Sequence, residues 1–461
     1  MIKGAVIKDD DWGNAKIKEG STLLMMGSAD ELPKEPAEKP VFVEDMSDTQ
    51  LAAALKMPAG LTNLGNTCYM NATLQCLRAI PELKDTLKGY TGQLGGALNP
   101  DESITTAVRD LYSQMDHTAS AIPPIVMLQV LHMCYPQFAE KNEHGTYQQQ
   151  DANECWTEIV RCLQRRLPAS KLDNSKEAVS AAAASKGFID QYMSGEFAIT
   201  MKCIEAEEEE PTHSTETFYQ LSCFIEKEVK YLYTGLKSRL EEHISKHSPT
   251  LGRDAQYSRK CEIRRLPAYI TVQMVRFFYK EKEGVNAKIL KDIKFPEILD
   301  VLDLCTEELK TKLIPARDRF KEEEDKKAEQ LQEIKSKGTV SKEGETTDSK
   351  KMKALPYSFP DDPGSNNSGY YELQAVLTHK GRSSSSGHYV GWCRNKGDEW
   401  VMFDDDKVTA VTKEDILRLS GGGDWHCAYL LLYGPRILEI EEETTSDKAS
   451  SESTPMESSS S

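Results

Sequence analysis

Cys68 is the residue of this sequence best placed for nucleophilic chemistry, because a helix is expected to begin at it. It lies in the stretch Gly60–Asn71, GLTNLGNTCYMN, and the apolar residues that follow recur at helical spacing until Pro81 interrupts them. Asn66 and Thr67 are residue types that cap helix N-termini. In the first turn of a helix, the dipole and the unpaired backbone N–H groups favour a thiolate over a thiol.

The alternative for Cys68 is a structural role. The chain has eleven cysteines, and a free cysteine is more often a small buried apolar side chain than a nucleophile. Thiol exchange is disfavoured, since the nearest cysteine that could resolve a disulfide is Cys76, eight residues later. A histidine partner would decide between the structural and the catalytic interpretation.

His388 has the most informative setting among the nine histidines. It follows a small polar loop, residues 381–387, and begins a strand that we predict over His388–Arg394. The glycine in residues 395–398 is typical of a hairpin leading into a second strand, Glu399–Asp404. A lone histidine at a strand edge is usually structural. A carboxylate across the hairpin, together with the upstream thiol, favours catalysis.

The hairpin brings a carboxylate next to His388, but two registers compete. A turn centred on Lys396 places Asp404 opposite His388, and a turn centred between Lys396 and Gly397 places Asp405 there. Directly opposed residues have Cβ atoms about 4.5–5.5 Å apart. Either carboxylate could hold the imidazole tautomer and stabilise the imidazolium, as a triad requires. A slip of one residue reverses the face, so hairpin geometry alone leaves both aspartates open.

The elements expected around these residues change from helices to strands along the chain. A strong helix is predicted over Asp151–Leu167. The later segments have strand-like composition, at Tyr269–Phe278, Tyr371–Thr378, His388–Arg394, Glu399–Asp404 and Cys427–Tyr433. We therefore expect an α+β protein with the cysteine in a helical half and the histidine in a sheet half.

The two chemical centres together resemble the cysteine box and the histidine box of the ubiquitin-specific proteases, a family of papain-like cysteine proteases. The resemblance spans about Pro58–Arg436 and rests on residues 60–71, 371–379, 387–390, 403–405 and 428–433. It implies a papain-like α+β fold with a helical thumb, a β-sheet palm and β fingers. It also implies a thiol protease that hydrolyses the isopeptide bond, or a thiol-labile ester or amide, at the C-terminal glycine of ubiquitin. Residues 148–154 and the serine loop resemble the proteasome-associated branch of the family most.

The resemblance assigns a role to each residue of the predicted site. Cys68 would attack the glycine carbonyl, and His388 would protonate the leaving amine and then activate water. Asp404, directly after the phenylalanine, matches the third triad member. Asn63 matches the side chain that binds the oxyanion together with the backbone N–H of Cys68. The alternative for Asn63 is a loop residue that closes an Asx turn.

Four further residues match positions that contact the ubiquitin tail, and each has a structural alternative. Asp151 and Glu154 begin the predicted helix with the spacing of a capping box, which would explain them without a ligand. Tyr389 and Tyr429 would line the tunnel for the terminal glycines, although strand aromatics are more often core residues.

The serine run Ser383, Ser384, Ser385 and Ser386 resembles a loop that covers the tail groove in the free enzyme. It would gate access and offer a phosphorylation site, and the alternative is a solvated turn. Many members of the family hold zinc on two Cys-x-x-Cys pairs in the fingers. Here Cys203, Cys223, Cys261 and Cys305 stand alone. We therefore expect no structural zinc and no cofactor.

Outside the catalytic domain, expected over residues 58–437, the chain is expected to be irregular. Residues 1–29 resemble only the C-terminal half of a ubiquitin-like domain, as expected for a truncated domain or an alternative product, and residues 30–57 are expected to form a linker. Within the catalytic domain, surface inserts are predicted near 168–187, 205–217 and 321–353, the last as disorder or a partly helical solvated loop. Residues 438–461 are predicted to be a disordered acidic tail.

Composition restricts the partners. The chain of 461 residues has a net charge of −17 and a pI near 5.2, which disfavours nucleic acid and anionic membranes. Free thiols indicate a reducing compartment, so we expect a cytoplasmic protein, with a nuclear pool compatible. The resemblance implies ubiquitin, its conjugates and the 26S proteasome regulatory particle as partners. The alternative function is a ubiquitin-binding scaffold of the proteasome with little turnover of its own.

Overall fold

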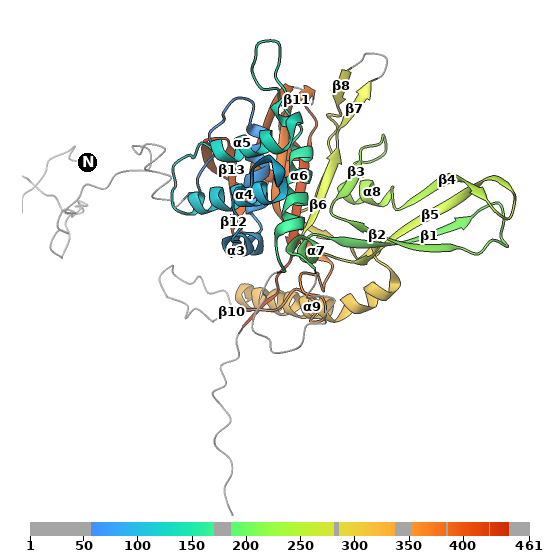
Figure 1. Cartoon of the computed structure of the whole chain (residues 1–461). Helices are drawn as coiled ribbons and strands as arrows, with labels where there is room; N and C mark the ends of the chain where they lie inside the picture. The colour runs from blue at the N-terminus through green and yellow to red at the C-terminus, as the bar shows by residue number, and fades with distance from the viewer. Residues whose placement is uncertain are drawn as a thin grey trace, which may run out of the picture. The chain divides into compact units, whose positions relative to one another are not determined.

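The computed structural model describes residues 57–169, 186–280, 285–336, 352–383, 386–423 and 425–441 (Figure 1). Several predicted segments lie outside the described residues. These are the ubiquitin-like segment 1–29, the linker except for its last residue, most of the insert at 168–187 and the tail beyond 441. Among the described residues, no helix has the length and apolar content needed to cross a membrane.

The helical half, the thumb, is built around α2. Its main helices are α2 (Cys68–Arg78), α3 (Pro81–Lys88), α4 (Pro100–Asp116), α5 (Ile125–Cys134), α6 (Ala152–Arg166) and α7 (Phe188–Tyr192). Every residue of α2 except Arg78 is buried, because the helix packs between α6 and the palm sheet. The predicted stop at Pro81 is confirmed, and this proline also occupies the first turn of α3, where its missing N–H costs nothing.

The palm is an eight-stranded sheet with the order β14-β13-β12-β11-β15-β6-β3, to which β9 adds beside β11. Its strands are β3 (Leu221–Phe224), β6 (Ile270–Val275), β9 (Ile298–Asp300), β11 (Tyr370–Ser383), β12 (Ser386–Lys396), β13 (Glu399–Asp404), β14 (Lys407–Val411) and β15 (Cys427–Pro435). Alternate residues of the central strands face two separate cores. Leu377 and Tyr389 pack with the thumb helices, whereas Val376 and Val390 pack on the opposite face. This two-sided burial holds the histidine strand between the two cores.

The fingers are a four-stranded sheet with the order β2-β1-β5-β4, formed by β1 (Gly195–Cys203), β2 (Thr212–Phe218), β4 (Glu241–Ser248) and β5 (Arg253–Arg265). In Figure 1 these green and yellow strands project away from the thumb helices. The predicted loop 205–217 was wrong in its second half, because residues 212–217 belong to β2 and pair with β1. At the tip, Cys203 and Ala206 pack with Ala255 and Tyr257 in a small apolar cluster.

The remaining elements of the described chain are α8 (Leu232–Lys237), the long helix α9 (Glu307–Ser336), α10 (Lys413–Leu417), the hairpin β7 (Phe277–Lys280) with β8 (Val285–Lys288), the pair β10 (Met352–Ala354) with β16 (Glu439–Glu441), and 3-10 turns at Gly96–Leu98, Pro136–Ala139, Leu302–Leu304 and Arg418–Ser420. Two boundaries differ from the prediction. Residues 321–336 continue α9, so the helical alternative holds there. Residues 439–441 form a strand, so the tail prediction began too early.

Candidate active site

Cys68 is the first residue of α2, and its side chain is buried. Thr67 occupies the N-cap position but makes no capping bond; its hydroxyl instead accepts from the backbone N–H of Leu64 at 2.9 Å. The chain enters the helix through two left-handed residues, Gly65 and Asn66, with φ of 102° and 55°. Glycine and asparagine adopt this conformation at least cost. The predicted placement of the thiol in the first turn is confirmed.

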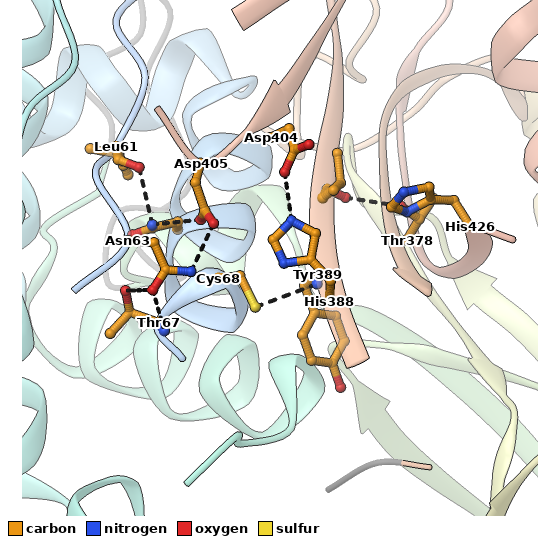
Figure 2. A network of polar contacts seen from close by, with 12 residues as sticks. Leu61, Asn63, Thr67, Cys68, Thr378, His388, Tyr389, Asp404, Asp405 and His426 are labelled. Atoms are coloured by element: carbon orange, nitrogen blue, oxygen red, sulfur yellow. Dashed lines mark hydrogen bonds and ion pairs between the residues drawn. The ribbon is translucent and has the colours of Figure 1, made fainter. Parts of the chain in front are cut away.

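The imidazole of His388 lies between Asp404 and Cys68 (Figure 2). Its Nε2 atom is 2.5 Å from Oδ1 of Asp404, which leaves Nδ1 for the thiol. The hydrogen bond to Asp404, followed by that to Cys68, raises the pKa of His388 from 6.5 to about 10. The same bond lowers the pKa of Asp404. The arrangement therefore favours an imidazolium beside the sulfur at neutral pH.

The strand register brings neither aspartate directly opposite His388. Gly391 pairs with Phe403, and the ladder between β12 and β13 shifts between Arg394 and Lys396, where an extra residue bulges. Both predicted registers were wrong because Lys396 pairs with Glu399, so the turn is centred between Gly397 and Asp398 rather than at or just after Lys396. Asp404 reaches His388 diagonally, a separation that long side chains can span.

Asp405 has a different task from its neighbour, because its φ of 54° turns it away from the strand direction. Its two carboxylate oxygens accept from Nδ2 of Asn63 and Nδ2 of Asn71, each at 2.8 Å. Its carbonyl accepts from the N–H of Leu61 at 2.9 Å. Burial raises the pKa of Asp405 despite these bonds. Asp405 thus fastens the loop before Cys68 to the end of β13.

Asn63 forms the Asx turn that was its structural alternative. Its Oδ1 accepts from the N–H of Gly65 at 2.9 Å, which closes an Asx turn, and from the N–H of Thr67 at 3.3 Å. One Nδ2 hydrogen is donated to Asp405. The second has no partner among the described residues. The turn therefore orients an amide that can still donate to an oxyanion.

Two further donors reach the sulfur of Cys68, and the sequence analysis predicted this contact for neither of them. The backbone N–H of Tyr389 lies 3.5 Å from Sγ, and Nε2 of Gln149 lies 3.4 Å from it. Tyr389 follows from the position of His388 in the strand. Gln149 comes from a distant segment, and its only sequence signal is a run of three glutamines before α6.

The four predicted tail-binding residues differ in exposure. Asp151 caps α6 by accepting from the N–H of Asn153 at 2.7 Å, and it also accepts from the Tyr429 hydroxyl at 2.8 Å. Glu154 is exposed and does not complete a capping box. Tyr389 and Tyr429 are buried in the thumb-side core, with ring centroids 6.1 Å apart.

The serine segment differs from the predicted loop. Strand β11 continues to Ser383 and β12 begins at Ser386, and these two residues pair, so the strands extend through most of residues 381–387. Ser384 and Ser385 lie outside the described residues. Gly381 and Gly387, with φ of 126° and 134°, accommodate the irregular pairing before the turn.

The site also contains the one group of side chains among the described residues whose spacing could hold a metal ion. His388, Asp404 and Asp405 offer ligand atoms within 4.8 Å of one another. All three are engaged in the contacts given above, which account for their proximity.

The histidines nearest to the site differ from His388, because burial lowers the pKa of His379 to about 3 and of His426 to about 4. Both are neutral at pH 7, and of these three His388 alone is favoured as a cation.

Comparison with known proteins extends over the whole catalytic region. Residues 59–433 match the family described as Ubiquitin carboxyl-terminal hydrolase. The chain is 40% identical over 452 residues to "Ubiquitin carboxyl-terminal hydrolase 6" of Arabidopsis thaliana, covering 95% of this chain and 91% of that protein. It is 38% identical over 448 residues to "Ubiquitin carboxyl-terminal hydrolase 14" of Caenorhabditis elegans, covering 95% and 86%.

The fold has solved counterparts. In the structure titled "Structure of the SAGA Ubp8/Sgf11/Sus1/Sgf73 DUB module bound to ubiquitin aldehyde", one chain is similar with a TM-score of 0.54. The sequences are 21% identical, and the match covers 82% of this chain and 71% of that one. At this identity the likeness establishes the mixed α+β fold alone.

Proposed function

This chain belongs to the ubiquitin carboxyl-terminal hydrolase family, and from that premise we propose that Cys68, His388 and Asp404 form its catalytic triad. Membership makes the protein a thiol-dependent deubiquitinating hydrolase. The observation that carries the residue assignment is the imidazole of His388, which lies 2.5 Å from Asp404 and faces the thiol at the start of α2.

In the acylation step, the Cys68 sulfur attacks the carbonyl carbon of ubiquitin's C-terminal glycine in the isopeptide bond. The carbonyl π electrons move onto the oxygen, which accepts hydrogen bonds from Asn63 Nδ2 and the backbone N–H of Cys68. When the tetrahedral intermediate collapses, the C–N bond breaks. The imidazolium of His388 gives its proton to the lysine amine, which leaves. A thioester remains on Cys68.

In the deacylation step, the now neutral imidazole removes a proton from water, and the resulting hydroxide attacks the thioester carbon. The C–S bond breaks, and ubiquitin leaves as a carboxylic acid, which gives its proton to water and becomes a carboxylate. Cys68 returns to the thiolate and His388 to the imidazolium, so no external oxidant, reductant or metal is consumed. Asp404 holds the imidazole orientation through both steps.

The ubiquitin tail is proposed to pass between the start of α6 and the palm. Glu154, the exposed carboxylate, suits a basic side chain of the tail better than Asp151, which is occupied by the α6 N-terminus and by Tyr429. Tyr389 and Tyr429 would wall the narrow part around the glycines. Their burial in the core makes them a rigid wall rather than mobile lids.

The proteasome is proposed as the place of action, based on the sequence resemblance to proteasome-associated members of the family. A cytoplasmic location with a nuclear pool agrees with this. Residues 383–386 would gate the tail groove and offer serine hydroxyls to a kinase. The runner-up is a scaffold that binds ubiquitin on the proteasome and turns over little, because a closed gate would leave the triad idle.

The test is covalent capture by ubiquitin that carries an electrophile at its C-terminus. We expect the full chain to form one thioether adduct, with and without proteasomes, and Cys68→Ala to form none. Cys134→Ser is the matched control, since Cys134 is a partly exposed thiol outside the site and its loss should leave labelling intact. Failure of the wild-type chain to label under both conditions would favour the scaffold.

The role of the first residues can be tested in the same material. Residues 1–57 are proposed to hold a partial ubiquitin-like segment and a linker that contribute to docking. A proteasome pull-down of the full chain is compared with that of a chain beginning at Pro58. Equal recovery would show that docking is a property of the catalytic domain.

A further inference from the structure

The middle glutamine of the run Gln148–Gln150 contacts the sulfur of Cys68. Its Nε2 atom donates to Sγ at 3.4 Å, across 81 residues of sequence. Gln148 is exposed and donates instead to the carbonyl of Lys141 at 3.2 Å. We propose that Gln149 is a catalytic residue of this enzyme, whose side-chain amide stabilises the Cys68 thiolate. The inference rests on the proposed role of Cys68 as the nucleophile.

The segment before Gln149 is hydrogen-bonded to the loop before Cys68. This bond helps to hold Gln149 against the sulfur of Cys68. Asn66, two residues before Cys68, donates through Nδ2 to the carbonyl of Tyr147 at 2.9 Å. The Tyr147 ring packs on His132 of α5, with centroids 4.3 Å apart, and the ammonium of Lys141 lies 4.9 Å from its centroid. Lys141 and Tyr147 also form a β-bridge. The backbone two residues from Gln149 is therefore tied to the residues that place the thiol.

The chemistry of the sulfur explains the use of an amide here. The thiolate accepts from the His388 imidazolium on one side and from the N–H of Tyr389 on another. Gln149 adds a third, neutral donor, and hydrogen bonds to a charged acceptor are stronger than those to a neutral one. The amide cannot lose its proton or protonate the sulfur. It therefore favours the thiolate over the thiol at any pH, independently of the histidine.

A second possibility makes the opposite prediction. An amide lying against the sulfur could instead block the carbonyl of the incoming glycine, so that Gln149 would have to move before catalysis. In that case, removing the side chain would raise turnover. In the role proposed here, the same change slows both alkylation and turnover, and it moves the pH dependence.

The experiment measures alkylation of Cys68 by iodoacetamide in the full chain from pH 5 to 9, read by mass spectrometry of the Cys68 peptide. Gln149→Met keeps the shape and removes the donor. We expect its rate at pH 6 to fall about 5- to 10-fold, and the pH of half-maximal rate to rise. Gln149→Glu, which places a negative charge there, should move this pH further. Gln148→Met is the matched control and should behave like wild type.

The outcomes separate this inference from the proposed function. If wild-type Cys68 reacts no faster than Cys134 and does not capture the ubiquitin probe, the proposed nucleophile is wrong. If wild-type Cys68 is fast and Gln149→Met matches it at every pH, Gln149 has no catalytic role. Faster turnover of Gln149→Met would also overturn the proposal, in favour of a blocking residue. Gln149 is only partly buried, so unchanged thermal unfolding is expected and excludes a folding defect as the cause.

Discussion

The active site and the tip of the fingers both contain carboxylates that accept hydrogen bonds, but the two regions are built differently. At the fingertip, defined here by Cys203, Glu209, Ser248 and Tyr257, the Glu209 carboxylate accepts from two hydroxyls, Ser248 at 2.6 Å and Tyr257 at 2.5 Å. These bonds lower its pKa. In the active site, two consecutive aspartates shift in opposite directions. Asp404 is lowered by the imidazolium, and Asp405 is raised by burial among neutral amides.

The sequence separation of the contacts explains what each region can do. The fingertip bonds join residues 39 and 48 positions apart, all in or beside the fingers strands. The Asp405 bonds join residues 342 and 334 positions apart, across the contact of thumb and palm. The active-site geometry therefore depends on docking between the two halves, whereas the fingertip is a local unit. Substitutions in the active site should therefore change turnover, and substitutions at the fingertip should change stability.

The largest effect short of losing the nucleophile is expected for Asp404→Asn. The asparagine keeps the size of the side chain but removes the charge that contributes most to the raised pKa of His388. The imidazolium is then lost at lower pH, so the alkaline limb of kcat/KM should move to lower pH. At pH 7.5 kcat/KM should fall about 10²–10⁴-fold. The measurement is hydrolysis of a fluorogenic ubiquitin amide from pH 5 to 10, with exposed Asp406→Asn as the control.

The same pair has a linked effect on stability. The folded pKa of His388 is raised above 6.5, so its contribution is complete below pH 6.5 and is lost as the pH rises through about 10. The folded pKa of Asp404 is depressed, so its contribution is present above its usual value of 3.8 and is lost in acid. Wild type should therefore lose the pair's stabilisation at both ends of this window. A difference in Tm between wild type and Asp404→Asn that did not change with pH would contradict the linkage.

The next effect in size is expected for Asn63→Ala, which tests whether the amide serves the oxyanion or only the loop. Loss of one oxyanion donor should lower kcat by about 10²–10³-fold with little change in KM. Asn395→Ala, at an exposed position near the end of β12, is the control. If alkylation of Cys68 falls as much as kcat does, the main task of Asn63 is the Asx turn that places the thiol.

Local patterns predicted the parts of the site that depend on one element. The helix start at Cys68 follows from the apolar spacing and the stop at Pro81, and the strand of His388 follows from its composition. The choice between Asp404 and Asp405 could not follow from the hairpin count, because the turn is centred between Gly397 and Asp398 and leaves neither aspartate opposite His388. The left-handed φ of Asp405 then separates the tasks of the two aspartates.

Contacts between distant segments account for the rest. The contact of Gln149 with Cys68 arises only when the segment before α6 docks on the cysteine loop, and no periodicity signals it. Strand β2 was missed for another reason. Its residues Thr212–Thr217 are exposed on both faces and only Phe218 is buried, so an alternating apolar pattern is absent. Tertiary pairing with β1, rather than local composition, makes it a strand.

The smallest effect on turnover is expected at the fingertip. Glu209→Gln keeps the size of the side chain but weakens both hydroxyl bonds, so Tm should fall while kcat/KM of the fluorogenic substrate stays unchanged. Treatment with EDTA should change neither, because the apolar contacts of Cys203, Ala255 and Tyr257 hold the strands at this position. A drop in Tm with EDTA would mean that a metal holds the fingers. A drop in kcat/KM for Glu209→Gln at a temperature where the protein stays folded would contradict the separation of the two regions, because it would show that a local change at the tip reaches the contact between thumb and palm.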